Sequence, residues 1–106
     1  EHALIPTGIA IQLPDSGYAA MVYARSGLAV RHGLGLLNGV GVIDSDYTGE
    51  IKVGLINQGH EPYTISPNER IAQLIIHTVA CPEFHEVESL GETERGEGGF
   101  GSTGRK

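Results

Sequence analysis

Residues 70–79, RIAQLIIHTV, form the most apolar stretch of the chain and indicate its fold class. The stretch is rich in β-branched residues and carries no helix cap, so it favours a buried central strand over a helix. Residues 9–13 and 51–55 alternate apolar side chains with others, and residues 18–24 continue with small and β-branched residues, so each of these stretches also predicts a strand. We therefore expect an all-β fold, either a sandwich or a barrel.

Turn-forming residues divide the chain into short pieces. The 16 glycines and 5 prolines are spread between short apolar runs, which is typical of many strands joined by tight turns and leaves almost no helix. Residues 34–42, LGLLNGVGV, lead into IDSDYTGEI. The glycines and Asn38 there predict a β-hairpin, with Asp44, Asp46 and Tyr47 at its tip or shoulder.

Length, composition and charge exclude several classes of protein. A chain of 106 residues forms one compact domain, and no apolar run reaches the roughly 18–20 residues that a membrane span needs. The net charge of −6 argues against general affinity for nucleic acid. The single cysteine, Cys81, cannot close an intrachain disulfide, and no charged-then-apolar leader opens the sequence. We therefore expect a soluble protein of the reducing cytoplasm, with no nucleic-acid or membrane partner.

The C-terminal end has a composition of its own. Residues 83–97 carry six glutamates against one arginine, and GGFGSTGRK follows at 98–106. We predict a β domain over residues 1–88 and a flexible, glycine-rich C-terminal arm over residues 89–106. Arg95, the glycine amides and the aromatic Phe100 suit an anion and base clamp. The glycine-rich composition alone equally fits a solvated linker. The G-x-G-x-x-G spacings of the arm have no helix after them, so a dinucleotide-binding fold is rejected.

Other polar residues leave alternatives open when each is taken alone. Arg25, Ser26 and Gly27 follow a predicted strand and suit phosphate oxygens, but they equally fit a solvated surface turn. Asp44 beside Asp46 could be a metal site, a general base or a polar turn. Tyr47 could be a cross-strand packing partner.

Four motifs in order resolve these alternatives. They are ARSGLA at 24–29, GVIDSDYTGEI at 41–51, RIAQL at 70–74 and RGEGGFGSTG at 95–104. Together they resemble the second to fifth motifs of the trimeric dUTPases, the deoxyuridine triphosphate nucleotidohydrolases. The first motif of that family, Ala-Gly-x-Asp-Leu, has no counterpart in residues 1–106.

The resemblance implies a fold, an activity and a cofactor. It implies a distorted jelly-roll sandwich of the β-clip type, in a homotrimer with three active sites that are each built from all three chains. The implied reaction converts dUTP to dUMP and pyrophosphate, which keeps uracil out of DNA and supplies dUMP for thymidylate synthesis. Mg²⁺ is expected to be held mainly by the substrate phosphates and by water, with no direct protein ligand in this chain.

The resemblance also implies a role for each site residue. Asp44 matches the carboxylate that activates the attacking water, and Tyr47 matches the ring beneath the deoxyribose. The uracil-binding residues are Asn38, Gly41, Val42, Ile43 and Lys52. The phosphate-binding residues are Arg25, Ser26, Gly27 and Gln73. In the C-terminal arm, Arg95 matches the γ-phosphate position, Phe100 lies over uracil, and Gly101, Ser102 and Thr103 close around the triphosphate.

Two other functions remain as alternatives. A dCTP deaminase shares this fold, but the D-x-x-Y-x-G spacing that begins at Asp44 weighs against it. A catalytically inactive, dUTPase-like binding or regulatory module is suggested by the missing first motif.

Overall fold

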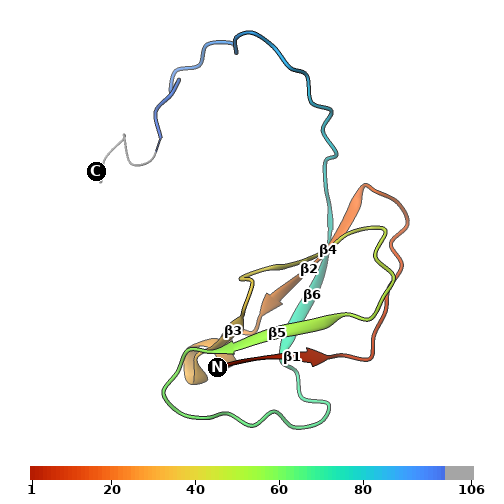
Figure 1. The fold of residues 1–106 in the computed structure, drawn as a ribbon, viewed down its shortest axis with the longest axis vertical. Helices are drawn as coiled ribbons and strands as arrows, with labels where there is room; N and C mark the ends of the chain where they lie inside the picture. Colours follow the sequence, from red (N-terminus) through yellow and green to blue (C-terminus); the bar gives the residue numbers. More distant parts are fainter. Residues whose placement is uncertain (100–106) are drawn as a thin grey trace.

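The computed structural model describes residues 1–99, and its body consists of two three-stranded antiparallel sheets (Figure 1). One sheet has the order β1-β5-β3 and is built from β1 (His2–Pro6), β5 (Lys52–Asn57) and β3 (Leu34–Leu36). The other has the order β4-β2-β6 and is built from β4 (Gly41–Ile43), β2 (Tyr18–Ala24) and β6 (Ala72–Thr78). A single short helix, α1 (Ser26–His32), occurs in the described part of the chain. The all-β prediction is confirmed; the finer jelly-roll assignment stays a prediction.

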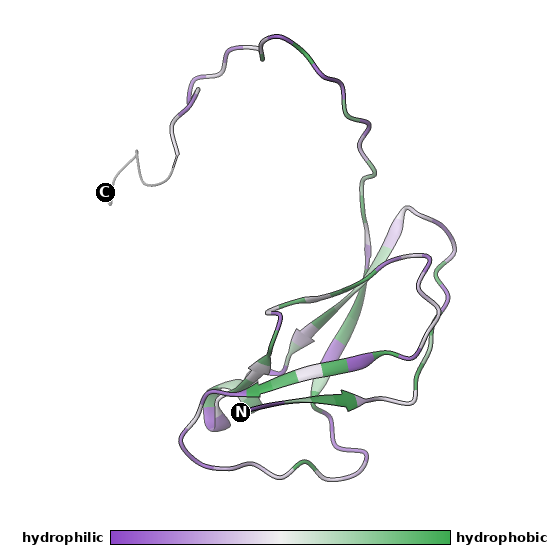
Figure 2. Cartoon of the chain, viewed as in Figure 1, coloured by the Kyte–Doolittle hydropathy of each residue, from purple (hydrophilic) through white to green (hydrophobic). Residues whose placement is uncertain are grey.

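The core lies between the two sheets. Val22 of β2 packs with Leu36 of β3 and with Val53 and Leu55 of β5, and all four are buried. Strand β2 covers the predicted range, and it lies at the centre of its sheet with β4 on one side and β6 on the other. Figure 2 shows apolar segments, in green, along the strands of both sheets. The core therefore fixes the positions of β2 and β5, from which the polar loops project.

The strand predicted over residues 9–13 is wrong, because the first strand ends earlier, at Pro6. Gly8 adopts a left-handed conformation with φ of 75°, which an extended strand does not allow. Its N–H donates to the Glu50 carboxylate at 2.8 Å, and the N–H of Ile9 donates to the Thr7 hydroxyl at 3.1 Å. These two amides bond to side chains instead of a neighbouring strand, so the alternating pattern of residues 9–13 does not become a ladder.

Strand β6 is confirmed, but its predicted burial at the centre of a sheet is wrong. It pairs with β2 alone and lies at the edge of the β4-β2-β6 sheet. Its side chains Leu74, Ile75 and Ile76 are 40%, 44% and 48% exposed. Consecutive residues of a strand point to opposite faces, so both faces of β6 expose apolar surface.

The predicted hairpin over residues 34–52 is also wrong. Strand β3 pairs with β5, whereas β4 pairs with β2, so the chain crosses from one sheet to the other and back again. The reason is the core, because Ile43 of β4 packs against the same cluster that contains Val53 of β5. The two strands face each other across the core instead of lying side by side.

The chain leaves the sandwich after β6. Residues 79–99 contain no helix or strand, and Figure 1 shows this segment running away from the two sheets. The predicted boundary between residues 88 and 89 stays a prediction. No helix in the described range is both long and apolar enough to cross a bilayer.

Candidate active site

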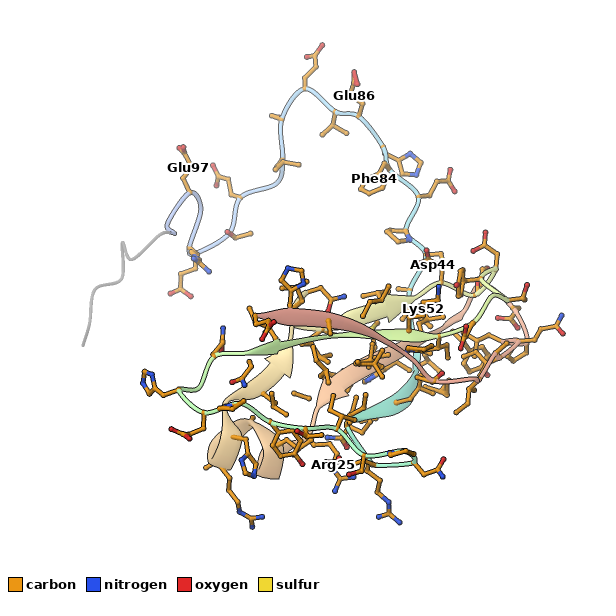
Figure 3. All side chains as sticks on the ribbon, turned by 60° about the horizontal axis from the view of Figure 1, so that its bottom comes forward. Arg25, Asp44, Lys52, Phe84, Glu86 and Glu97 are labelled. Atoms are coloured by element: carbon orange, nitrogen blue, oxygen red, sulfur yellow. The ribbon has the colours of Figure 1, made fainter. Side chains whose placement is uncertain are left out.

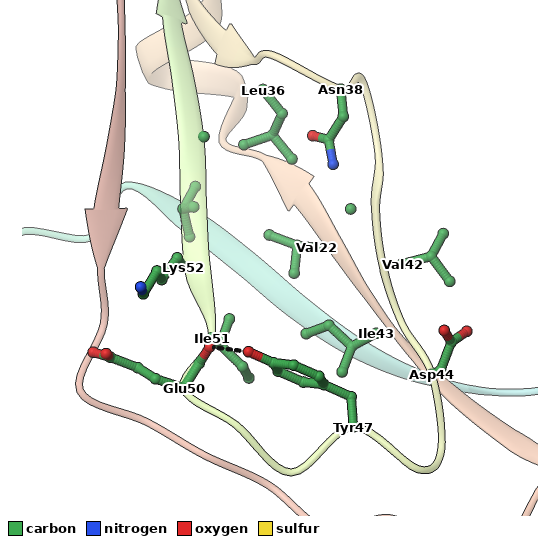
Figure 4. A pocket seen from close by; sticks show the side chains of 13 residues that line it. Val22, Leu36, Asn38, Val42, Ile43, Asp44, Tyr47, Glu50, Ile51 and Lys52 are labelled. Carbon is green, nitrogen blue, oxygen red and sulfur yellow. Dashed lines mark hydrogen bonds between the residues drawn. The ribbon is translucent and has the colours of Figure 1, made fainter.

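A pocket of about 320 Å³ opens between β4 and β5 (Figure 4). It is lined by seven of the residues that the sequence assigned to catalysis and to uracil and sugar binding: Asn38, Gly41, Val42, Ile43, Asp44, Tyr47 and Lys52. The structure therefore brings the predicted base-binding residues together, although they lie on a crossing between sheets and not on a hairpin. Glu50 and Ile51 also line the pocket, and the sequence analysis did not single them out as site residues.

The backbone of β4 forms one wall of this pocket. A Cβ on Gly41 would lie 3.3 Å from the Cβ of Val22, so the glycine lets β4 lie close against β2. Strand β4 is the edge of its sheet and bonds to β2 along one side only. Backbone N–H and C=O groups along the other side are available to a ligand in the pocket, because an edge strand presents unpaired donors and acceptors.

The Tyr47 side chain closes one end of the pocket. Its hydroxyl donates a hydrogen bond of 2.8 Å to the backbone carbonyl of Glu50, which Figure 4 shows as a dashed line. A Cβ on Gly49 would lie only 2.7 Å from the Tyr47 hydroxyl oxygen. Only glycine leaves room for the ring in this position.

The Asp44 carboxylate lies at the rim of the pocket, directly after β4 (Figure 4). The turn that follows is fixed by a hydrogen bond of 3.1 Å from the Tyr47 N–H to the Asp44 carbonyl. Asp44 is exposed. A carboxylate beside a pocket can act as a general base toward a water molecule.

The predicted phosphate-binding residues form a second cluster, where β2, α1 and β6 meet. Arg25 and Gln73 line an apolar groove of about 800 Å³, and Arg25 and Gly27 line a neighbouring pocket of about 380 Å³. The Gln73 side-chain amide donates to the carbonyl of Ala24 at 3.1 Å. Ser26 is the first residue of α1, so it belongs to the same junction.

The two clusters lie far apart within one chain. Figure 3 shows Arg25 on the opposite side of the sandwich from Asp44 and Lys52. Arg95 lies in the segment beyond the sandwich, where its side chain donates to the carbonyl of Gly98, and it lines none of the three pockets. The predicted residues Phe100, Gly101, Ser102 and Thr103 lie outside the described residues. One chain thus holds separate parts of the predicted site.

A hydrogen-bonded pair, Tyr63 and Glu69, holds the loop before β6 against α1. The Tyr63 hydroxyl donates to the Glu69 carboxylate, which also accepts the N–H of Ser66 at 2.8 Å. The Tyr63 ring packs on the His32 ring with 4.6 Å between centroids. No pattern in the sequence indicates this pair, since its two members acquire a shared role only when the loop folds back on the helix.

This pair predicts a pH-dependent contribution to stability. The bond from Tyr63, followed by that from Ser66, lowers the pKa of Glu69, and the bond to Glu69 raises the pKa of Tyr63. The stabilisation is therefore present at neutral pH, lost as the pH falls through the lowered carboxyl pKa, and lost again as the pH rises through the raised phenol pKa.

A Tyr63→Phe variant tests this contribution. Its loss in the free energy of unfolding should be largest between about pH 5 and about pH 9 and should shrink on both sides of that range. Urea unfolding of both proteins over a pH series measures the difference. A difference that does not vary with pH would show that the hydrogen bond to the ionised carboxylate is not its source.

Comparison with known proteins gives the family. The family model described as dUTPase matches residues 1–104. This chain belongs to the dUTPase family. The deoxyuridine 5'-triphosphate nucleotidohydrolase of Desulfitobacterium hafniense is 59% identical over 100 residues, which cover 94% of this chain and 66% of that relative. The corresponding protein of Fusobacterium nucleatum is 51% identical over 105 residues, which cover 99% of this chain and 71% of that relative.

Solved structures of the dUTPase family share the fold. A mutant of the Staphylococcus bacteriophage 80alpha dUTPase with dUpNHpp has a TM-score of 0.85 and 29% sequence identity, and the match covers 99% of this chain and 77% of that chain. Another mutant structure of the phage 80alpha dUTPase has a TM-score of 0.79. The chain described here spans slightly less than two thirds of the length of the Desulfitobacterium relative, at 66%.

Proposed function

We propose that this protein hydrolyses dUTP to dUMP and pyrophosphate. Its family membership supports the proposal, and one observation in the structure carries it. Seven predicted site residues line a single pocket, with the free backbone edge of β4 on one wall and the Asp44 carboxylate at the rim. This arrangement combines a surface that can pair with a base and a group that can deprotonate water.

The β4 edge would recognise uracil through the main chain. Uracil presents an acceptor, a donor and an acceptor along its pairing edge, and N–H and C=O groups between Asn38 and Ile43 can match that order. Cytosine carries a donor at the exocyclic position, so its binding would leave polar groups buried without partners. Such a mismatch is a strong basis for discrimination.

Tyr47 would distinguish deoxyribose from ribose by its volume. The ring lies at the end of the pocket and is held by its bond to the Glu50 carbonyl. We propose that the sugar stacks on this ring and that a 2′-hydroxyl would collide with it. The ring can perform this role only if it stays in place, which depends on Gly49.

Substitution of Gly49 by alanine should weaken sugar discrimination. The new Cβ would lie 2.7 Å from the Tyr47 hydroxyl oxygen, so the ring must move and lose its bond to Glu50. We expect the ratio of kcat/KM for dUTP to that for UTP to fall by about tenfold. Gly35→Ala is the matched control, since a Cβ there meets nothing within 4 Å. Equal ratios in the wild type and both variants would show that the position of Tyr47 does not determine sugar selection.

Asp44 would orient the attacking water and take its proton. Mg²⁺, when bound to the triphosphate, would neutralise phosphate charge and polarise the phosphoryl groups. Within residues 1–99, no three His, Cys, Asp or Glu side chains form a group that could hold a metal ion. We propose that the ion is held mainly by the substrate phosphates and by water.

A homotrimer with shared active sites would bring the separate clusters together. The uracil pocket and the cluster of Arg25 and Gln73 lie apart in one chain. The large apolar side chains of β6, Leu74, Ile75 and Ile76, are 40–48% exposed. Association of chains can bury that surface and place the phosphate residues of one chain beside the uracil pocket of another. Arg95 and residues 100–103 would then close over the phosphates and Phe100 over uracil, excluding water.

A substrate panel tests this proposal against its alternatives. The full chain is incubated with dUTP, dCTP and UTP in the presence of Mg²⁺, and pyrophosphate and ammonia are both measured. Release of pyrophosphate from dUTP, but not from dCTP or UTP, supports the proposal. Release of ammonia from dCTP would support a deaminase, and binding of dUpNHpp without any product from dUTP would support an inactive binding module. Cytoplasmic location and the absence of nucleic-acid and membrane partners belong to the same proposal.

A further inference from the structure

Three arginines line the pocket of about 380 Å³ beside α1. They are Arg25 at the N-cap of the helix, Arg31 in its last turn, and Arg70 just before β6. In the described part of the chain, no carboxylate lies within 4.0 Å of these three guanidinium groups. A chain with a net charge of −6 has therefore gathered three of its seven lysine and arginine residues around one hollow.

The one carboxylate that lines this pocket is already engaged. Glu69 accepts hydrogen bonds from the Tyr63 hydroxyl and from the N–H of Ser66. It can offset one positive charge at most, which leaves an excess of about two positive charges around the pocket. Three guanidinium cations around one pocket repel one another until an anion enters.

The Arg31 side chain points toward the proposed phosphate residues. Helical side chains lean toward the N-terminus of their helix, and Nη1 of Arg31 lies 3.9 Å from the position that a Cβ of Gly27 would occupy. Its guanidinium thus lies over the first turn, next to Gly27, and not at the C-terminal carbonyls, where a cation would only offset the helix dipole.

We propose that Arg31 is a further phosphate-binding residue, which together with Arg25 and Arg70 binds a diphosphate group in this pocket. The inference rests on the proposed function and deepens it, because the group would be the terminal diphosphate of a nucleoside triphosphate or free pyrophosphate. Planar guanidinium groups bind phosphate oxygens through paired, charge-assisted hydrogen bonds. Arg31 would make the site select nucleotides by the length of their phosphate chain, independently of the base.

Binding measurements on the full chain test the role of Arg31. Arg31→Gln should weaken the affinity for dUpNHpp and for inorganic pyrophosphate by about tenfold while the affinity for dUMP stays unchanged. It should raise KM for dUTP more than it lowers kcat. Arg31→Lys should recover part of the loss, because it restores the charge without the planar fork.

A charge-matched control distinguishes the effect of a local contact on affinity from the effect of the protein's overall electrostatic field. Gln12→Glu changes the net charge by the same amount, and Gln12 is exposed and lines none of the three pockets, so it should leave these affinities within about twofold. A loss for pyrophosphate but not for dUpNHpp identifies the free product as the ligand, and a loss for both identifies the nucleotide tail as well.

Unchanged affinity for both ligands in Arg31→Gln, or an equal loss of dUMP affinity, would overturn the proposal. The proposed function fails separately, if the wild type binds pyrophosphate through Arg31 but does not hydrolyse dUTP.

Discussion

An Asp44→Asn variant should bind dUpNHpp as the wild type does and lose turnover of dUTP by about 10²–10⁴-fold. Asparagine keeps the size of the side chain and cannot accept the proton of the attacking water. The backbone bond from the Tyr47 N–H to the carbonyl of residue 44 does not involve the side chain, so the turn and the pocket should be preserved. Calorimetric binding and pyrophosphate release measure the two effects.

Asp46→Asn is the control for this experiment. Asp46 lies two residues further along the same loop, is exposed, and does not line the uracil pocket. The Asp46→Asn variant removes the same charge as Asp44→Asn, so it measures any effect of the loop's general electrostatic field. Normal dUTP hydrolysis by Asp44→Asn, or equal losses of turnover in the two variants, would show that Asp44 is not the general base.

The strands could be predicted from the sequence where local pattern and core agree. Residues 18–24 form β2 because their small and β-branched side chains fit the centre of a sheet. Residues 9–13 show an equally regular pattern, but the left-handed turn at Gly8 and the side chains of Thr7 and Glu50 take up the neighbouring amides. An alternating pattern predicts which face of a strand each side chain would occupy. It does not reveal hydrogen bonds that compete with strand pairing.

The sequence also could not show how strands are distributed between sheets. The pattern around Asn38 is compatible with a hairpin, and only the shared core of Ile43 and Val53 places the two strands in different sheets. The apolar character of residues 70–79 predicts a strand buried at the centre of a sheet. In the structure, Leu74 and Ile76 are exposed at the sheet edge, and the homotrimer that we propose would cover them.

Likewise, only part of the candidate site could be predicted from the sequence. The residues of the motif at 41–51 are close in sequence, and they line one pocket together with Asn38 and Lys52. The separation of Arg25 from Asp44 follows from the path of β2 through the sandwich, which no local motif contains. The orientation of Arg31 and the Tyr63–Glu69 pair likewise depend on how a loop and a helix pack.

The separation of the two clusters leads to the second large effect that we expect. Arg25→Ala and Asp44→Asn should each be inactive alone, yet mixed oligomers of the two variants should recover activity. If one chain supplies Arg25 and its neighbour supplies Asp44, random mixing in equal amounts leaves both groups intact in about one quarter of the sites. Refolding the two variants together and measuring pyrophosphate release from dUTP gives the recovered fraction.

A second mixture distinguishes shared sites from simple stabilisation by association. A mixture of Asp44→Asn with Tyr47→Ala combines two defects in the same pocket. The uracil pocket of every site then carries one defect or the other, so activity should not rise above that of Tyr47→Ala. Recovery in the first mixture and not in the second requires that Arg25 and Asp44 act across a boundary between chains. If neither mixture recovers although the chains exchange, both clusters must serve the reaction from within one chain, and the proposed sharing of sites would be wrong.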